Sequence, residues 1–147
     1  MYKKILVPLD GSKLAEIALS HAESLAVRYK ADLVFLTVID PPKMAGRNGA
    51  AVDMFRQEMD TKMQEAEMYL KVLKGKFEKK KIQAKIVVSL GSVVKNIIDT
   101  AESESVDLVL IASHGRTGLQ RVFFGSAAAG VLNRIEQPLM VIRKPPE

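Results

Sequence analysis

A glycine-rich stretch near the end of the chain holds the residues best suited to chemistry. His114, Gly115 and Arg116 follow an apolar segment, and Gly125-Ser126 precedes a second segment with helical character. Glycines let backbone N–H groups approach an anion closely, and a helix N-terminus adds about half a positive charge. Ser126 offers a hydroxyl, while His114 and Arg116 offer further donors. The stretch has the layout of a phosphate cradle, but the same glycines also suit a plain loop in which Ser126 only caps a helix.

Asp10 is the second candidate for chemistry. It stands directly after the short apolar run at residues 3–9 and before Gly11. Aspartate before glycine is a common turn former, which gives it a purely structural explanation. At the carboxyl end of a strand, the same carboxylate can accept hydrogen bonds from ribose hydroxyls or an adenine amine. Both interpretations stand at this level.

Motifs for other kinds of site are absent from the sequence. It contains no GxxxxGK(S/T) loop, no GxGxxG fingerprint, no HExxH helix and no GxSxG elbow. Zero cysteines exclude a thiol nucleophile and a Cys-ligated zinc site. His114 has no evident nucleophile and orienting acid beside it. We therefore expect no catalytic residue and no metal held by protein side chains.

Nine alternating elements are needed to position these residues. Strands are predicted at 3–9, 31–39, 84–90, 106–112 and 139–142. Helices are predicted after Ser12, at 54–81 and 93–105, and from Ser126 to about 135, with a loop at 43–53. Strands that alternate with long crossovers form a parallel sheet with helices on both faces. The sequence thus predicts one domain over residues 1–147, a doubly wound, Rossmann-like α/β fold with a five-stranded parallel sheet.

Charge and composition limit the partners. The net charge is +5, but residues 71–85 hold seven Lys and one Glu, so this stretch carries +6 and the rest of the chain sums to −1. A single lysine-rich helix end without interleaved arginine and aromatic residues does not favour nucleic-acid binding. No apolar run approaches the roughly 18 residues of a membrane span, and the N-terminal apolar run is too short for a signal peptide. We expect a cytoplasmic protein with no nucleic-acid or membrane partner.

The chain resembles the universal stress proteins over nearly its full length. The opening residues 4–12 (KILVPLDGS), the segment 38–40 (VID), the Gly91 loop and the segment 106–109 (VDLV) look like that family. Its ATP-binding branch carries G-x2-G-x9-G-S/T after the fourth strand. Gly115, nine intervening residues and Gly125-Ser126 match the second half of this motif, while Ala112 replaces its first glycine.

This resemblance implies a nucleotide site between the first and fourth strands. By position, Pro8, Asp10 and Val38 would hold the adenine and ribose of ATP, ADP or AMP. Ala112 would lie where the chain comes closest to the ligand. The phosphate-binding residues would be Gly115, Gly125 and Ser126, with His114 and Arg116 nearby. A magnesium or manganese ion would sit on the phosphates rather than on the protein.

The resemblance also implies function and assembly. It indicates a nucleotide-dependent stress regulator or switch with at most slow intrinsic ATP hydrolysis, and a homodimer formed through the last strand, Leu139–Arg143. The alternative is a nucleotide-free dimeric interaction module, like the family branch that lacks the glycine motif. Ala112 favours the alternative, whereas Gly115, Gly125 and Ser126 favour nucleotide binding.

Overall fold

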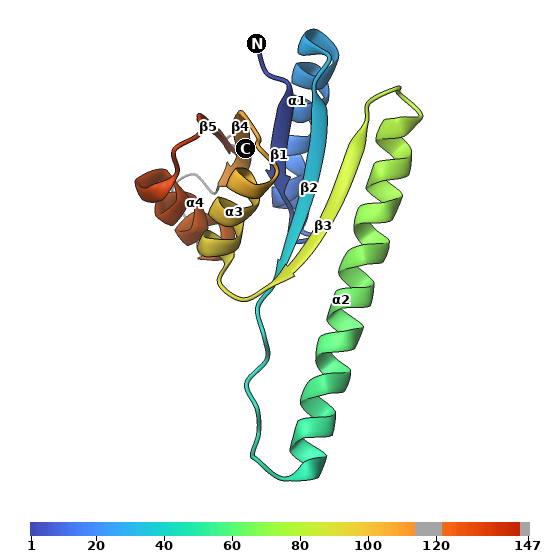
Figure 1. Cartoon of the computed structure of the whole chain (residues 1–147), viewed down its shortest axis with the longest axis vertical. Helices are drawn as coiled ribbons and strands as arrows, with labels where there is room; N and C mark the ends of the chain where they lie inside the picture. The colour runs from blue at the N-terminus through green and yellow to red at the C-terminus, as the bar shows by residue number, and fades with distance from the viewer. Residues whose placement is uncertain (114–121, 145–147) are drawn as a thin grey trace.

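β1 is the central strand of a five-stranded sheet in which all neighbours are parallel (Figure 1). The computed structural model describes the backbone of residues 1–113 and 122–144, and the side chains of residues 1–113 and 128–144. The strands, in the spatial order β3-β2-β1-β4-β5, are β1 (Lys4–Pro8), β2 (Asp32–Ile39), β3 (Ala84–Leu90), β4 (Leu108–Ser113) and β5 (Leu139–Arg143). The predicted fold class is confirmed.

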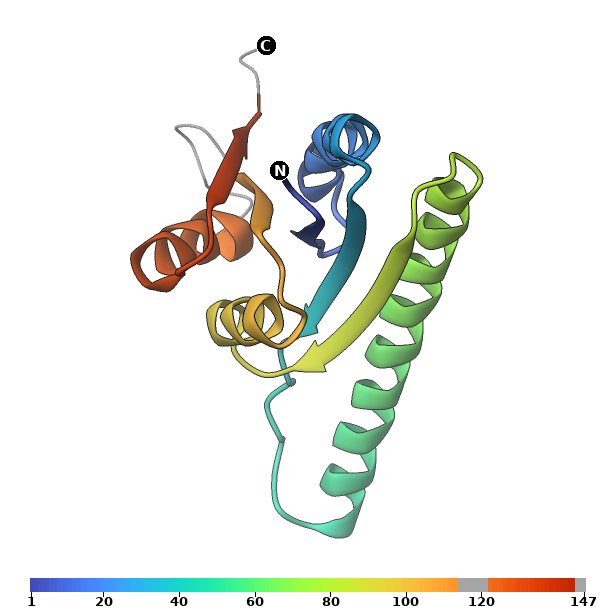
Figure 2. The same cartoon turned by 45° about the horizontal axis from the view of Figure 1, so that its top comes forward.

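Four helices cover the two faces of this sheet. They are α1 (Lys13–Tyr29), α2 (Gly49–Glu78), α3 (Val93–Ser103) and α4 (Val122–Arg134). Figure 2 shows α1 and α2 on one face and α3 and α4 on the other, as right-handed crossovers on either side of β1 require. Ile5, Leu6 and Val7 of β1 are fully buried because helices cover both faces. No helix in the described part of the chain is long and apolar enough to cross a membrane.

Side-chain caps fix where three of the helices begin. Ser12 Oγ accepts a hydrogen bond from the Ala15 N–H at 3.1 Å, which confirms the predicted start of α1. Asn48 Oδ1 accepts from the Ala51 N–H at 2.8 Å, so α2 begins at Gly49. The predicted loop at 43–53 therefore extends too far, because Gly49 and the lack of periodicity up to residue 53 are typical of a loop although α2 already begins at Gly49. α2 ends at Glu78, three residues before the predicted end at Lys81. Lys81 itself has a left-handed backbone, with a φ of +63°, which a right-handed helix does not contain.

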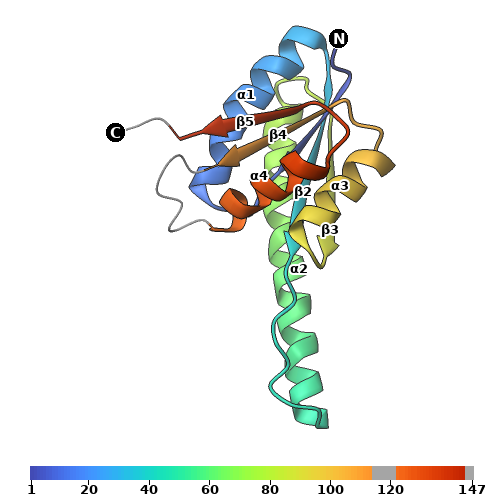
Figure 3. The ribbon, with the colours of Figure 1, turned by 90° about the vertical axis from the view of Figure 1, so that its left-hand side faces the viewer.

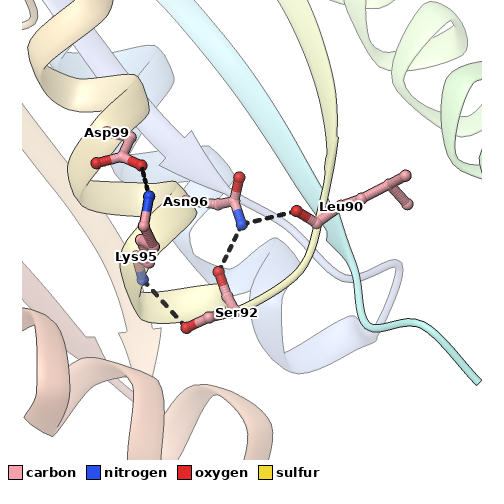
Figure 4. A network of polar contacts seen from close by, with 5 residues as sticks. All are labelled: Leu90, Ser92, Lys95, Asn96 and Asp99. Carbon is pink, nitrogen blue, oxygen red and sulfur yellow. Dashed lines mark hydrogen bonds and ion pairs between the residues drawn. The ribbon is translucent and has the colours of Figure 1, made fainter. Parts of the chain in front are cut away.

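The turn from β3 into α3 is closed by a polar network (Figure 4). Ser92 Oγ accepts from the Lys95 N–H at 3.3 Å, while Asn96 Nδ2 donates to the carbonyls of Leu90 and Ser92 at 3.0 and 2.7 Å. Gly91, with a φ of +115°, takes the conformation that makes this turn. The network satisfies carbonyls and N–H groups that the strand and helix leave unpaired.

α4 begins earlier than the sequence predicts. Its first residue is Val122, so Gly125 and Ser126 lie inside the helix and Ser126 is not its N-cap. The prediction was wrong because it took Gly125 as the end of a loop. A single glycine costs a helix only about 1 kcal/mol relative to alanine, so the helix continues through it.

The amino edge of the sheet is held by one carboxylate. Asp107 accepts hydrogen bonds from the Lys3 N–H at 2.9 Å and the Lys4 N–H at 3.3 Å. Its own N–H donates to the Lys4 carbonyl at 2.9 Å. These contacts fix the start of β1 beside the start of β4.

Carboxylates also neutralise part of the lysine-rich segment. Lys80 pairs with Glu23 of α1 at 2.9 Å, and Lys85 pairs with Glu104 at 2.8 Å. Within α2, Lys71 pairs with Glu67 at 3.0 Å. Lys80 and Lys85 thus bind neighbouring elements of the same chain and Lys71 binds its own helix, in keeping with a solvated helix end.

The first prediction concerns the contact between α3 and α4. A Cβ at Gly130 would lie 2.7 Å from Cγ2 of Val94. Gly130→Ala gains about 1 kcal/mol of helix propensity but loses about 1–3 kcal/mol to overpacking, so we expect a lower free energy of unfolding. In a Val94→Ala background the clash is gone and the same change should stabilise the protein. Urea denaturation of the four variants measures this, and an equal effect in both backgrounds would contradict the contact.

Candidate functional site

β1 and β4 separate before they reach the carboxyl edge of the sheet. They pair only at Ile5 with Leu108 and at Leu6 with Val109, although β1 runs to Pro8 and β4 to Ser113. Past this point β1 stays with β2, and β4 stays with β5. The chain reverses its strand order between β1 and β4, so this is the topological switch point, where open α/β sheets bind ligands.

Asp10 lies at this edge, just after β1. Its Oδ1 accepts the Ser12 N–H at 2.9 Å, which ties it to the start of α1. Among the residues that the structure describes, Oδ2 has no hydrogen-bond partner. The side chain is partly exposed, and the turn beyond it needs Gly11, whose φ is +83°. Asp10 thus forms the turn and also keeps one carboxylate oxygen free.

Three other predicted residues lie on strands at the same edge. Pro8 ends β1, Val38 precedes the last residue of β2, and Ala112 precedes the last residue of β4. All three are buried, with Ala112 only 1% exposed. The backbone of Ala112 is extended, and it is not among the positions with positive φ. Its methyl group therefore fits the strand without backbone strain.

The predicted phosphate-binding residues are described only in part. His114, Gly115 and Arg116 lie outside the described residues. The backbone of Gly125 and Ser126 lies near the N-terminal end of α4. The structure thus brings Pro8, Asp10, Val38 and Ala112 to one edge of the sheet. The chain leaves β4 at this edge and continues to α4.

A cavity on the α2 side of Asp10 includes residues that sequence analysis missed. It has a volume of about 290 Å³, and its lining includes Asp10, Thr37, Ala66 and Tyr69. Thr37 is 7% exposed, and its Oγ1 has no hydrogen-bond partner in the described chain. Thr37 follows apolar neighbours in a buried strand, so the sequence gave no signal that its hydroxyl lines a cavity.

Tyr69 of α2 connects this cavity to α1. Its hydroxyl donates to Glu16 Oε2 at 3.0 Å. Burial raises the pKa of Tyr69 well above its usual range, and the hydrogen bond to Glu16 and the charges of Glu16 and Asp10 add to the effect. The phenol therefore stays neutral and keeps its proton on the bond to Glu16. Residues 16 and 69 stand 53 positions apart, and no local pattern predicts such a pair.

No protein-held metal site is evident in the described part of the chain. Residues 1–113 and 122–144 contain no group of three or more His, Asp or Glu side chains that could hold an ion. Asp10 and Glu16 instead accept hydrogen bonds, from the Ser12 N–H and the Tyr69 hydroxyl.

Comparison with known proteins identifies the family. The model of the universal stress protein family matches residues 1–143. The chain belongs to the universal stress protein family. Universal stress protein MJ0577 of Methanocaldococcus jannaschii is 30% identical over 156 residues, which cover 98% of this chain and 96% of the relative. A solved structure of MJ0577 has a TM-score of 0.85 at 28% identity, covering 100% of this chain and 99% of that one.

Two further structures show how the fold varies in this family. The universal stress protein UspA from Lactobacillus plantarum has a TM-score of 0.82 at 26% identity, covering 97% of this chain and 98% of that one. A universal stress protein from Archaeoglobus fulgidus in complex with dAMP is more distant, with a TM-score of 0.58 at 15% identity. The match covers 96% of this chain and 98% of that protein's chain. At this low sequence identity the similarity concerns the fold alone.

The second prediction follows from the extended backbone at Ala112. Because no strain is stored there, Ala112→Gly gains nothing in the folded state and loosens the unfolded chain. We expect the free energy of unfolding to stay the same or to fall by up to about 1 kcal/mol. Thermal and urea denaturation test this. A glycine variant that is clearly more stable than the parent would mean that Ala112 is strained.

Proposed function

We propose that this universal stress protein binds an adenine nucleotide (ATP, ADP or AMP) and acts as a nucleotide-dependent stress regulator or switch. The observation that carries the proposal is the separation of β1 from β4 after Leu6, on the way to Asp10. The separation creates a switch point between the two strands. The free carboxylate oxygen of Asp10 lies on the β1 side, and the connection from β4 to α4 lies on the other side. A distant family member, the universal stress protein from Archaeoglobus fulgidus, has been solved in complex with dAMP, which supports an adenine nucleotide as the ligand proposed here.

The adenosine end is assigned to β1 and β2. Asp10 Oδ2 is free to accept hydrogen bonds from the ribose hydroxyls, while Oδ1 stays on the Ser12 N–H. Pro8 and Val38 are buried apolar residues at the same edge of the sheet, and we assign them to contact with the purine ring. A carboxylate held by the turn that it forms is already oriented, so binding costs little further ordering.

The phosphates are assigned to the β4–α4 connection. Gly115, Gly125 and Ser126, with His114 and Arg116, are the residues proposed to hold them. Gly125 and Ser126 are the fourth and fifth residues of α4, just past the N–H groups of residues 122–124, which lack intrahelical partners. They therefore lie at the end of the helix where its dipole favours an anion. A magnesium or manganese ion, when present, would neutralise phosphate charge and be held by the phosphates.

The proposed role is regulation rather than efficient catalysis. Fast phosphoryl transfer needs a residue that positions the attacking water near the γ-phosphate. Asp10 is assigned to the adenosine end, so it does not serve that purpose. Any ATP hydrolysis by this site would then be slow and intrinsic.

A nucleotide-free dimeric interaction module is the second candidate function. Ala112 favours it, because a buried methyl group stands where the ATP-binding branch has a glycine. ATP titration of the Ala112→Gly variant separates the two candidates. The nucleotide proposal expects its affinity to stay within about tenfold of the parent, which is 1.4 kcal/mol. Binding by the glycine variant alone at millimolar ATP would favour the module.

The third prediction tests the assignment of Asp10. Asp10→Asn keeps an oxygen for the Ser12 N–H but removes the charge and turns one acceptor into a donor. We expect the affinity for ATP to fall at least tenfold, since hydrogen bonds to charged groups contribute about 1.5–3 kcal/mol. Asp40→Asn is the matched control, because Asp40 is an exposed aspartate just past β2 and should leave the affinity unchanged. Equal calorimetric affinities for both variants would contradict the assignment.

We also propose a homodimer through β5. In the described chain β5 is an outer strand of the sheet. The Lys144 N–H donates to the Ser113 carbonyl of β4, and N–H groups alternate sides along a strand. The Ile142 N–H therefore points toward β4, and the Val141 N–H points toward the free edge. An isologous pair of such edges is the simplest closed arrangement.

The fourth prediction uses this alternation. Val141→Pro removes an N–H that faces outward and should convert a dimer into a monomer while the fold stays intact. Val141→Thr is the control, because it keeps the N–H and the strand preference. Sedimentation velocity at micromolar concentration measures the outcome. A parent protein that is monomeric, or a proline variant that still dimerises as the parent does, would refute pairing through β5.

A further inference from the structure

The cavity beside Asp10 contains a polar group that the protein itself leaves unsatisfied. Thr37 lines this cavity and is 7% exposed, and its Oγ1 has no hydrogen-bond partner in the described part of the chain. A buried hydroxyl without a partner is costly, and such groups are rare in folded proteins. The missing partner must therefore come from the contents of the cavity.

Thr37 lies on the face of the sheet that α2 covers, which is the rear face in Figure 3. Phe35, two residues earlier in β2, contacts Phe77 of α2 edge to face, with ring centroids 5.2 Å apart. Because side chains alternate along a strand, Thr37 shares this face, whereas Val38 lies on the face of α3 and α4. The register of β1 with β2 places Pro8 on the same side as Val38. The sheet therefore separates the cavity from the residues assigned to the purine.

The polar groups that line the cavity beside Thr37 are mainly hydrogen-bond acceptors. Asp10 Oδ2 is free among the described residues, and the Tyr69 hydroxyl donates its proton to Glu16, so the phenol oxygen can only accept. The Thr37 hydroxyl can accept as well. Asp10, Thr37 and Tyr69 come from the turn after β1, from β2 and from α2, and all three line the same cavity. An occupant must therefore supply hydrogen-bond donors.

The balance of charge around the cavity is negative. Asp10 lines it, and the carboxylate of Glu16 lies directly behind Tyr69, at 3.0 Å from its hydroxyl. Burial first, and then Glu16 and Asp10, raise the pKa of Tyr69, so both carboxylates act on this space. Lys62 and Glu65 are exposed lining residues on neighbouring turns of α2, and their opposite charges offset each other. The cavity thus favours a cation over an anion.

The volume of the cavity limits the occupant to a small molecule. About 290 Å³ has room for roughly ten water-sized groups of about 30 Å³ each, which is too small for a nucleotide. Ile39 and Ala66 line the cavity with apolar surface. The cavity therefore suits a cation that carries a short apolar body.

We propose that this cavity binds a small primary amine in its ammonium form. The three N–H donors of an ammonium match three acceptors: Asp10 Oδ2, Thr37 Oγ1 and Tyr69 Oη. The alkyl body lies against Ile39 and Ala66. The site does not rest on the nucleotide proposal, because it uses the opposite face of the sheet and only Asp10 serves both.

The fifth prediction compares three ligands of similar size on protein freed of nucleotide. Hexylammonium, 1-hexanol and hexanoate share an alkyl chain and differ in the charge of the head group. Shifts in the amide NMR signals around Thr37 and Tyr69 should saturate below about 10 mM hexylammonium. Because bonds between ions and polar groups are the stronger ones, the alcohol and the carboxylate should bind at least about tenfold more weakly. Hexylammonium that fails to saturate, or that binds no better than hexanol, would overturn the proposal.

Substitutions of the two buried hydroxyls test where the amine binds. Thr37→Val keeps the shape of the side chain and loses no contact within the described chain, but it should lower the affinity for hexylammonium about tenfold. Thr37→Ser keeps a hydroxyl and should retain the affinity. Ser89→Ala is the matched control, because Ser89 Oγ is also buried without a partner in the described chain, yet its register with Val38 places it on the other face. Equal affinities of Thr37→Val and Ser89→Ala for hexylammonium would contradict the site.

The affinity for ATP separates this site from the nucleotide site. Thr37→Val should leave ATP binding unchanged, whereas Asp10→Asn should weaken both ligands. A loss of ATP binding in Thr37→Val equal to its loss of amine binding would mean that the two ligands share one site, and it would overturn the proposal. Circular dichroism shows whether each variant keeps its fold.

Discussion

The short ladder between β1 and β4 is the constraint on which the rest of the structure depends. Asp107 fixes the start of both strands through the N–H groups of Lys3 and Lys4, and the ladder ends after two residue pairs. The strands are thus joined at the amino edge and separate at the carboxyl edge. Asp10, just after β1, and Ala112, near the end of β4, therefore lie on opposite sides of the separation. A longer ladder would close the edge at which we place the ligand.

α2 connects this site to the outside of the molecule. Tyr69 bonds to Glu16 and lies near enough to Asp10 for the aspartate charge to affect its pKa. The same helix carries exposed apolar side chains at Met54, Met68 and Val72. One rigid element therefore touches the turn that forms the site and presents a surface to solvent. A regulator needs such a path, because a change at the ligand must reach a surface that a partner can contact.

The sequence was sufficient for the fold class but not for its details. Alternating apolar runs and turn residues place all five strands, and Ser12 correctly marks the start of α1. The predicted starts of α2 and α4 are wrong, because glycine favours loops but Gly49 and Gly125 both lie in helices. Thr37 and Tyr69 could not be found, since their roles depend on contacts between segments far apart in the chain. Residue spacing records local structure, whereas such cavities are products of packing.

The most direct measurement of the central claim is the nucleotide content of the native protein. The protein is purified without added nucleotide, denatured, and the released small molecules are identified by mass spectrometry and quantified against protein concentration. The account predicts an adenine nucleotide at close to one per chain, or, if it is lost during purification, a rise in melting temperature at millimolar ATP. Neither released nucleotide nor a thermal shift at millimolar ATP would contradict the account.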